Sequence, residues 1–354
     1  LSHLGSGYNV RKDRSMSPNH SVFVLDVEGT PLTSTTPTKA YKLMKGKQAK
    51  PVWNKFSQFG IQMLVTTRKE TPKTVLGVDL GTKFEGYSLI SGKENNLNVM
   101  WKLPDKKKLV RKLEERRTLR RARRQRNCRR RECRSDNRTR KNFIAPSQLV
   151  MVQSRLKAIK EFFMCYPIDA VALEDVKFNH RDNKWGRNFS TVEVGKQRIK
   201  DWISQKAYLH LFSGYDTEDC RERYGYKKSG NKDAEIFNSH CSDALALATE
   251  ISAQNHIEPG IFLVADDTYR PVRRRLHDTE FAKGGIRDKY STGNFRGIRK
   301  GTICNFGQIC GGIKDNIIRT YDWYSKRLSK NFDNLMWLSH NFKCKEASVN
   351  SPPL

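Results

Sequence analysis

Three acidic residues stand within or at the end of strongly apolar stretches that are far apart in the chain. They are Asp79 in the segment GVDLG, Glu174 in VALED and Asp243 in HCSDA. A carboxylate at the edge of a buried strand or helix is costly to desolvate unless it has a partner or a metal ion. The fold must therefore compensate all three charges, and three such acids in a very basic chain predict metal-dependent cleavage of nucleic acid.

The charge of the chain points to a polyanionic partner. The 354 residues include 67 Lys and Arg against 37 Asp and Glu, which gives a formal net charge of +30. Nucleic acid is the partner that such an excess favours. An anionic membrane surface is the alternative, but the sequence has no apolar run near the length of a membrane span and no basic amphipathic helix with a clean apolar face. We therefore expect nucleic acid and no membrane.

The eight cysteines include no C-x-x-C pair. A zinc ribbon is therefore not expected, and a chain this long and this charged does not suggest a disulfide framework. Reduced thiols, with no secretory signal peptide at the start of the sequence, predict a cytoplasmic protein. Residues 1–20 are polar and unpatterned, and they predict a disordered lead-in.

Hydrophobic patterning predicts an α/β protein built around a three-stranded antiparallel meander, with Asp79 at the end of its first strand. The predicted strands are 21–26, 59–67, 75–79, 84–91, 97–103, 170–174 and 261–265, and the predicted helices are 38–47, 148–166, 192–212 and 239–253. His240 and Asp243 would share one face of the first turn of the last helix. The chain beyond residue 266 is basic and Gly-rich at first, and it predicts a small β-rich domain.

Residues 106–141 differ sharply in character from the rest of the chain. They contain 19 Lys and Arg against four acids, a net charge of +15, with no Gly or Pro. The residue types are good helix formers, so a long helix is predicted. Leu109, Leu113 and Leu119 give only a thin apolar stripe, and most of the surface must face solvent or phosphate. Because like charges at i,i+4 destabilise an isolated helix, we expect this helix to form fully only on RNA or DNA.

Two-metal hydrolysis of a phosphodiester requires several carboxylates that converge on two divalent ions. Mg²⁺ or Mn²⁺ suits such oxygen ligands. We expect Asp79 to bridge two ions, Glu174 and Asp243 to hold one each, and His240 to act as general base. The order of acid-bearing strand, meander, helix, acid-bearing strand and acid-bearing helix is that of the RNase H-like fold. Each piece alone has another reading, since a G-x-D-x-G strand end also occurs in actin-like ATPases.

With these motifs the chain resembles IsrB, a family of transposon-encoded RNA-guided nickases related to IscB and to the ancestors of type II CRISPR effectors. That family carries a RuvC nuclease domain split into three sequence segments. GVDLG (77–81) is similar to the first, LEDVKF (173–178) to the second and SHCSDALALA (239–248) to the third, while 106–141 is similar to the arginine-rich bridge helix.

Further motifs extend the resemblance along the chain. The linking motifs are WG (185–186), FS (189–190), EVGK (193–196) and RYGYKK (223–228). Pro31–Ala40 resembles the N-terminal P-L-M-P segment, with Thr33 and Ser34 where Met and Pro are typical. Arg273–His277 and Arg299–Thr302 resemble the C-terminal part that reads the target-adjacent motif.

One absence narrows the resemblance. IscB has an HNH nuclease domain between the second and third RuvC segments, but only 66 positions separate Glu174 from His240, and the linking motifs fill them. A chain with one nuclease centre should cut one strand. The family implies a nick in the displaced non-target strand, while the guide RNA pairs with the other strand and carries the sequence specificity.

The resemblance also implies a domain organisation and a set of contacts. The expected units are a lead-in 1–20, a P-L-M-P-like domain 21–70, RuvC segment I 71–105, the bridge helix 106–141, RuvC segment II with linking helices 142–238, RuvC segment III 239–266, a motif-reading β-rich domain 267–345 and a tail 346–354. The expected RNA contacts are Arg116, Arg117, Arg120, Arg121, Arg123, Arg124, Arg126, Arg130 and Arg131. The expected contacts to the motif DNA are Arg273, Arg274, Arg275, Arg299 and Lys300, which either read base edges or touch only phosphates.

The implied partners are a structured guide RNA and double-stranded target DNA, bound by a protein monomer in a ribonucleoprotein of the prokaryotic cytoplasm and nucleoid. Two alternatives remain open from the sequence. A guide-independent endonuclease for branched DNA, such as a Holliday-junction resolvase, would share the fold but needs neither the Arg-rich helix nor a motif-reading domain. A catalytically silent RNA-guided DNA binder would not need the four candidate active-site residues.

Overall fold

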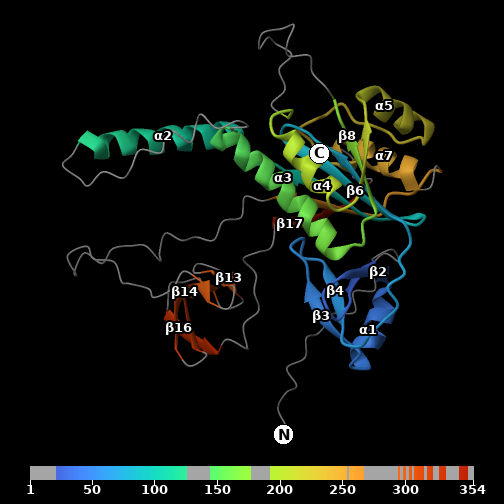
Figure 1. Cartoon of the computed structure of the whole chain (residues 1–354), viewed down its shortest axis with the longest axis horizontal. Coiled ribbons are helices and arrows are strands. Elements are labelled where there is room, and N and C mark those ends of the chain that lie inside the picture. Colours follow the sequence, from blue (N-terminus) through green and yellow to red (C-terminus); the bar gives the residue numbers. More distant parts are fainter. Residues whose placement is uncertain are drawn as a thin grey trace.

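The computed structural model describes residues 21–125, 144–176, 192–252, 255–266 and 343–349, together with the backbone of six short strands between 294 and 331. The chain is an α/β protein, as predicted (Figure 1). None of the helices in these ranges is long and apolar enough to cross a membrane.

A seven-stranded mixed sheet forms the centre, in the order β17-β10-β7-β6-β5-β8-β9. Its strands are β5 (Thr74–Asp79), β6 (Phe84–Ser91), β7 (Glu94–Lys102), β8 (Ala170–Glu174), β9 (Tyr208–Phe212), β10 (Ile261–Asp266) and β17 (Lys343–Ala347). Strands β5, β6 and β7 form the predicted antiparallel meander. On the side of β5 the sheet continues with β8 and β9, both parallel to β5.

Helices cover both faces of this sheet, and the strands alternate accordingly. Leu76 and Val78 of β5 belong to the core that packs against α3 (Pro146–Cys165) and α4 (Lys196–Ser204). Val75 belongs to the opposite core, built with α5 (Gly214–Arg223), α6 (Phe237–His240) and α7 (Ser242–Ser252). Because successive side chains of a strand point to opposite faces, Gly77 and Asp79 lie on the α7 side with Val75.

A second, smaller sheet precedes the central one. Its order is β2-β1-β4-β3, and the helix α1 packs on it. The bounds are β1 (Val22–Leu25), β2 (Pro31–Thr35), α1 (Pro37–Lys45), β3 (Ala49–Trp53) and β4 (Phe59–Met63). Phe56 attaches this unit to the central core through ring contacts with Trp101 and Phe162, and Lys55 pairs with the buried Glu161 at 3.0 Å.

The remaining elements are the basic helix and the strands beyond residue 290. Helix α2 (Lys106–Gln125) extends away from the central sheet (Figure 1), and the rest of the predicted 106–141 helix lies outside the described residues. The backbone beyond residue 290 forms a hairpin and a four-stranded antiparallel sheet, consistent with a β-rich C-terminal part. These strands are β11 (Asn294–Phe295), β12 (Ile298–Arg299), β13 (Ile303–Cys304), β14 (Gly307–Lys314), β15 (Ile317–Tyr321) and β16 (Arg327–Asn331).

Three expectations are wrong in detail. The helix predicted over 192–212 is only α4, which ends at Ser204, because Tyr208–Phe212 gains backbone pairing as the edge strand β9 beside β8. The helix predicted over 239–253 is two helices that meet at Cys241. Lys343–Ala347, divided in our expectation between the motif-reading domain and a tail, is strand β17, which pairs antiparallel with β10 in the central sheet.

Candidate active site

Asp79 and Glu174 lie side by side at the carboxyl ends of two neighbouring parallel strands. The register pairs Val78 of β5 with Leu173 of β8, and each acid is the next residue. Both acids project from the face that α7 covers, since both strands alternate in the same sense. Adjacent strands are about 4.8 Å apart, and the two carboxyl side chains interact by a hydrogen bond.

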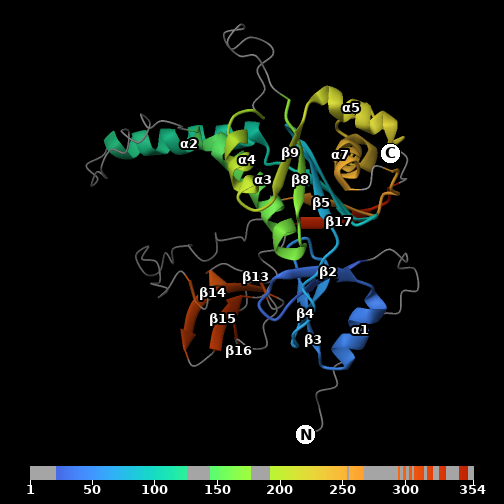
Figure 2. The ribbon, with the colours of Figure 1, turned by 45° about the vertical axis from the view of Figure 1, so that its right-hand side comes forward.

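Helix α7 packs against β5 (Figure 2), and it carries the third acid, whose charge acts on Asp79. Asp243 stands in its first turn and is 4% exposed. Helices α6 and α7 can pack directly on the sheet because glycines face them: a Cβ at Gly77 would lie 1.8 Å from the carbonyl oxygen of Ala244 in α7, and a Cβ at Gly86 would lie 1.7 Å from that of His240 in α6. Gly77, the first residue of GVDLG, thus determines how close Asp243 comes to Asp79.

Glu174 and Asp243 both act electrostatically on Asp79. Burial raises the pKa of Asp79 well above its ordinary value, and the charge of Glu174, the hydrogen bond with Glu174 and the charge of Asp243 raise it further. The ammonium of Lys228 acts in the opposite direction. Carboxylates that share a desolvated site cannot all ionise without a compensating cation. The donor set therefore fits a divalent cation that prefers oxygen ligands.

Two basic residues hold Asp243, one on each carboxylate oxygen. Arg221 of α5 donates from Nη1 to Oδ1 at 2.9 Å, and the Lys228 ammonium donates to Oδ2. Burial acts to lower the pKa of Lys228, but the hydrogen bond to Asp243 and the charges of Asp243 and Asp79 raise it overall. In the described part of the chain, no three His, Cys, Asp or Glu side chains are arranged to hold an ion as they stand.

Sequence reasoning assigned no role to these two basic residues. Lys228 is the last residue of the motif RYGYKK, and Arg221 lies two residues before that motif. The signal that could have found them is their position in a basic segment between the second acid and the third, since a buried acid in the first turn of an apolar helix calls for a counter-ion.

His240 does not share a helical turn with Asp243, contrary to our expectation. It is the last residue of α6, and Cys241 separates α6 from α7. Its Nε2 lies 3.0 Å from the carbonyl oxygen of Ala234, and its ring packs on Phe84 at a centroid distance of 4.7 Å. Burial lowers the pKa of His240, which favours the neutral ring.

Asp175 follows Glu174 directly but belongs to a different cluster. Its carboxylate binds the ammonium groups of Lys196 at 3.0 Å and Lys200 at 2.5 Å, both from α4. Although burial acts to raise its pKa, the hydrogen bonds from Lys200 and Lys196 lower it overall. Because successive side chains of a strand point to opposite faces, Glu174 lies beside Asp79, whereas Asp175 forms ion pairs with α4.

A buried polar network fixes the turn that follows Asp79. Arg155 of α3 donates from Nη2 to the carbonyl oxygen of Gly81 at 2.9 Å and from Nε to Glu85, and Tyr87 donates to Glu85 at 2.9 Å. Arg155 is 1% exposed. A charged residue on the apolar stripe of α3 was the sequence signal for this network, and our prediction did not use it.

The predicted nucleic-acid contacts are described only in part. Four of the predicted RNA-binding arginines on α2 are exposed, and Leu119 of the thin apolar stripe is 59% exposed. These arginines are Arg116, Arg117, Arg120 and Arg121. Arg123, Arg124 and Arg299 lie on described elements without described side chains. Arg126, Arg130, Arg131, Arg273, Arg274, Arg275 and Lys300 lie outside the described residues.

One comparison with known protein families finds a match that includes the basic helix α2. Residues 22–196 match the RRXRR protein family, which is typical of Arg-rich proteins similar to IscB and IsrB. The matched region runs from the start of β1 to the first residue of α4, and it contains Asp79, Glu174 and α2. Within α2, Arg120–Arg124 (RRARR) has the pattern that the name RRXRR spells. No curated protein matches the chain.

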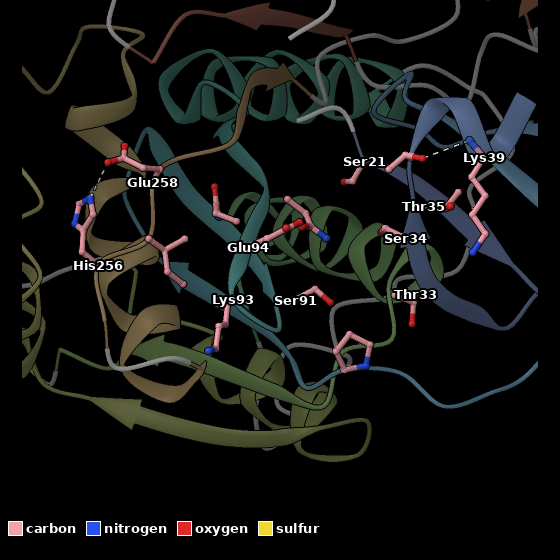
Figure 3. Close-up of a pocket in the computed structure, with 15 residues that line it drawn as sticks. Ser21, Thr33, Ser34, Thr35, Lys39, Ser91, Lys93, Glu94, His256 and Glu258 are labelled. Carbon is pink, nitrogen blue, oxygen red and sulfur yellow. Dashed lines mark hydrogen bonds and ion pairs between the residues drawn. The ribbon is translucent and has the colours of Figure 1, made fainter. Parts of the chain in front are cut away.

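A polar cavity of about 850 Å³ lies elsewhere, between the small N-terminal sheet and the end of the central sheet where β6 turns into β7 (Figure 3). Hydroxyl groups of Thr33 and Ser91 face it, together with the side chains of Lys39 and Lys93. None of the four predicted catalytic residues lines it. The carboxylate site is therefore distinct from this cavity.

Proposed function

We propose that the chain is an RNA-guided DNA nickase of the IsrB type, with a RuvC nuclease core of the RNase H-like fold. The observation that carries this proposal is the convergence of Asp79, Glu174 and Asp243 from three distant segments onto one end of the sheet. The strand arrangement supports it, because an antiparallel meander extended by two parallel strands beyond its first strand is the RNase H-like order. The RRXRR match supports the family assignment.

Asp79, Glu174 and Asp243 would hold two Mg²⁺ or Mn²⁺ ions, which when bound activate water and stabilise the leaving oxygen. The raised pKa of Asp79 supports this role, because burial is its largest cause and the like charges of Glu174 and Asp243 add to it. Lys228 and Arg221 fix the orientation of Asp243.

His240 would take the proton of the attacking water. Its Nε2–H group donates to the Ala234 carbonyl oxygen, so Nδ1 is left as the basic nitrogen. The lowered pKa keeps that nitrogen unprotonated near neutral pH. An oriented, neutral imidazole is what general-base catalysis requires.

Helix α2 would track the phosphates of the guide RNA, since its described surface is basic and exposed nearly all round. One nuclease centre with no room for an HNH domain supports single-strand cleavage. The reaction would take place in the prokaryotic cytoplasm on nucleoid DNA.

The test is to express the chain beside its native flanking DNA, sequence the copurified RNA, and measure Mg²⁺-dependent nicking of a matching duplex. Asp79→Ala should abolish nicking and leave RNA and DNA binding largely unchanged. Asp201→Asn, which changes an exposed acid on α4, is the matched control and should nick normally. Full nicking by Asp79→Ala would overturn the site, and cleavage of branched DNA by RNA-free protein would favour the guide-independent endonuclease.

A further inference from the structure

Lys228 interacts with two of the candidate metal ligands. Its ammonium donates to Oδ2 of Asp243 and acts electrostatically on Asp79 at the same time. A cation in this position compensates part of the negative charge that the three acids bring together. It therefore stands where an ion shared by Asp79 and Asp243 would have its strongest attraction.

The two basic partners of Asp243 differ in how firmly they are held. The Arg221 side chain is 14% exposed, and it pairs with Glu218 at 3.4 Å as well as with Asp243. The Lys228 side chain is 44% exposed, although Asp243 itself is only 4% exposed. Lys carries its charge on a flexible four-carbon stem, whereas the planar guanidinium of Arg is a preorganised fork. Lys228 can therefore move into solvent while Arg221 keeps Asp243 in place.

We propose that Lys228 is a built-in counter-cation, which occupies the cation position beside Asp243 and Asp79 until a divalent ion replaces it. The inference rests on the proposed function, in which these acids are metal ligands. An ion that enters must displace the ammonium from Oδ2, so the chain's own Lys228 lowers its affinity for divalent metal. Arg221, by contrast, is a positioning residue that stays on Oδ1 in both states.

The proposal predicts in which direction the affinity for divalent metal changes when the charge of Lys228 is removed. Removing a positive charge a few ångströms from an ion-binding site increases the attraction for a cation by several-fold to more than tenfold at the effective dielectric of a protein surface. Lys228→Met keeps the length of the side chain and removes the charge. It should therefore bind divalent metal more tightly than the native chain does.

The experiment uses the metal-stripped full-length chain without RNA and titrates it with Mn²⁺, with free Mn²⁺ followed by electron paramagnetic resonance. Lys228→Met should lower the Kd of the Asp79-dependent site by about tenfold. Lys228→Arg, which keeps the charge, should stay within about twofold of the native Kd. Lys227→Met is the matched control, because it removes the same charge from the neighbouring exposed residue, and it should also stay within about twofold.

Asp79→Asn separates the two ways in which the result could fail. If Mn²⁺ binding does not depend on Asp79, the carboxylates are not a metal site, and the proposed function and the inference fall together. If binding depends on Asp79 but Lys228→Met leaves Kd unchanged or weaker, only the role of Lys228 is overturned. An equal gain in Lys227→Met would also overturn it, since the effect would then come from general surface charge.

Discussion

Gly77 of β5 and Ala244 of α7 are in such close contact that a Cβ at Gly77 would stand 1.8 Å from the Ala244 carbonyl oxygen. Backbone lies against backbone at this point, and no side chain can turn aside to make room. The same approach brings Asp243 over the end of the strand that carries Asp79. Both the packing of α7 on the sheet and the approach of Asp243 to Asp79 therefore depend on the absence of a Cβ atom at Gly77.

Gly77→Ala should accordingly damage both stability and nicking. The helix must move away from the sheet, at a cost of about 3 kcal/mol or more, and Asp243 moves with it. Differential scanning calorimetry and a nicking assay would measure the two effects. Gly230→Ala is the matched control, because nothing lies within 4 Å of its added Cβ, and it should change the stability by less than about 0.5 kcal/mol. A stable, active Gly77→Ala protein would contradict the close contact.

Glu174 and Asp175 are adjacent in sequence, and their substitutions should have opposite effects. Glu174→Gln removes a like charge from beside Asp79, so nicking should be lost while the melting temperature is unchanged or higher. Asp175→Asn removes the partner of Lys196 and Lys200, so it should lower the stability by about 3 kcal/mol. Equal loss of stability in both variants would contradict the assignment of the two acids to different clusters.

The Asp175 ion pairs also predict a pH dependence. In the folded chain the pKa of Asp175 lies below its ordinary value, so the carboxylate stabilises the fold at neutral pH. That contribution is present above the unfolded pKa of about 3.9 and is lost as the pH falls through the lower folded value. Denaturant midpoints measured between pH 7 and pH 3 should show the gap between native protein and Asp175→Asn shrinking only below about pH 4.

The sequence was sufficient for the elements that repeat a simple pattern. The strands at 84–91 and 170–174 have the predicted bounds, because alternating or continuous apolar residues between polar turns specify a strand. The edge strand β9 was missed because Tyr208–Phe212 is only partly buried, and pairing with β8 rather than local propensity makes it a strand. Strand β17 was missed because residues 344–347 are likewise partly buried or exposed, and pairing with β10 makes them a strand.

The sequence was sufficient to predict which three acids form the carboxylate site, but it did not predict how the neighbouring residues are arranged around them. Apolar flanks identified Asp79, Glu174 and Asp243, since buried acids are unusual. The counter-ions Arg221 and Lys228 come from a helix and from the loop after it, and no local pattern encodes how closely the two approach Asp243. The break at Cys241, which separates His240 from the turn of Asp243, lies where the backbone packs against Gly86, and helical propensity gives no signal for it.

Arg155 and Glu85 form a buried pair that should be strongly coupled. Arg155→Met leaves the carboxylate of Glu85 buried without its guanidinium and removes the donor to Gly81, so it should cost about 3–5 kcal/mol. The double variant Arg155→Met/Glu85→Gln should recover a large part of this loss, because the buried charge is gone. A double-mutant cycle by thermal unfolding measures the coupling, and additive effects of the two substitutions would contradict a direct pair.

Helix α2 should contribute to RNA affinity through charge alone. Four of its exposed arginines, Arg116, Arg117, Arg120 and Arg121, face solvent in the described structure, so each is available to one phosphate. Changing all four to Gln should reduce the slope of log K against log salt concentration by about 3, since each phosphate contact contributes about 0.7–0.9. Filter binding of the copurified RNA between low and moderate salt measures that slope.

The control for α2 removes the same charge elsewhere. Lys42, Lys45, Lys47 and Lys50 of the small N-terminal unit are also exposed, and changing all four to Gln lowers the net charge equally. If α2 contacts the RNA directly, its variant should lose more of the salt dependence than this control, because the counter-ions released on binding come from the phosphates actually contacted. Equal losses would mean that the chain attracts RNA only by its overall charge, and the bridge-helix role of α2 would then be wrong.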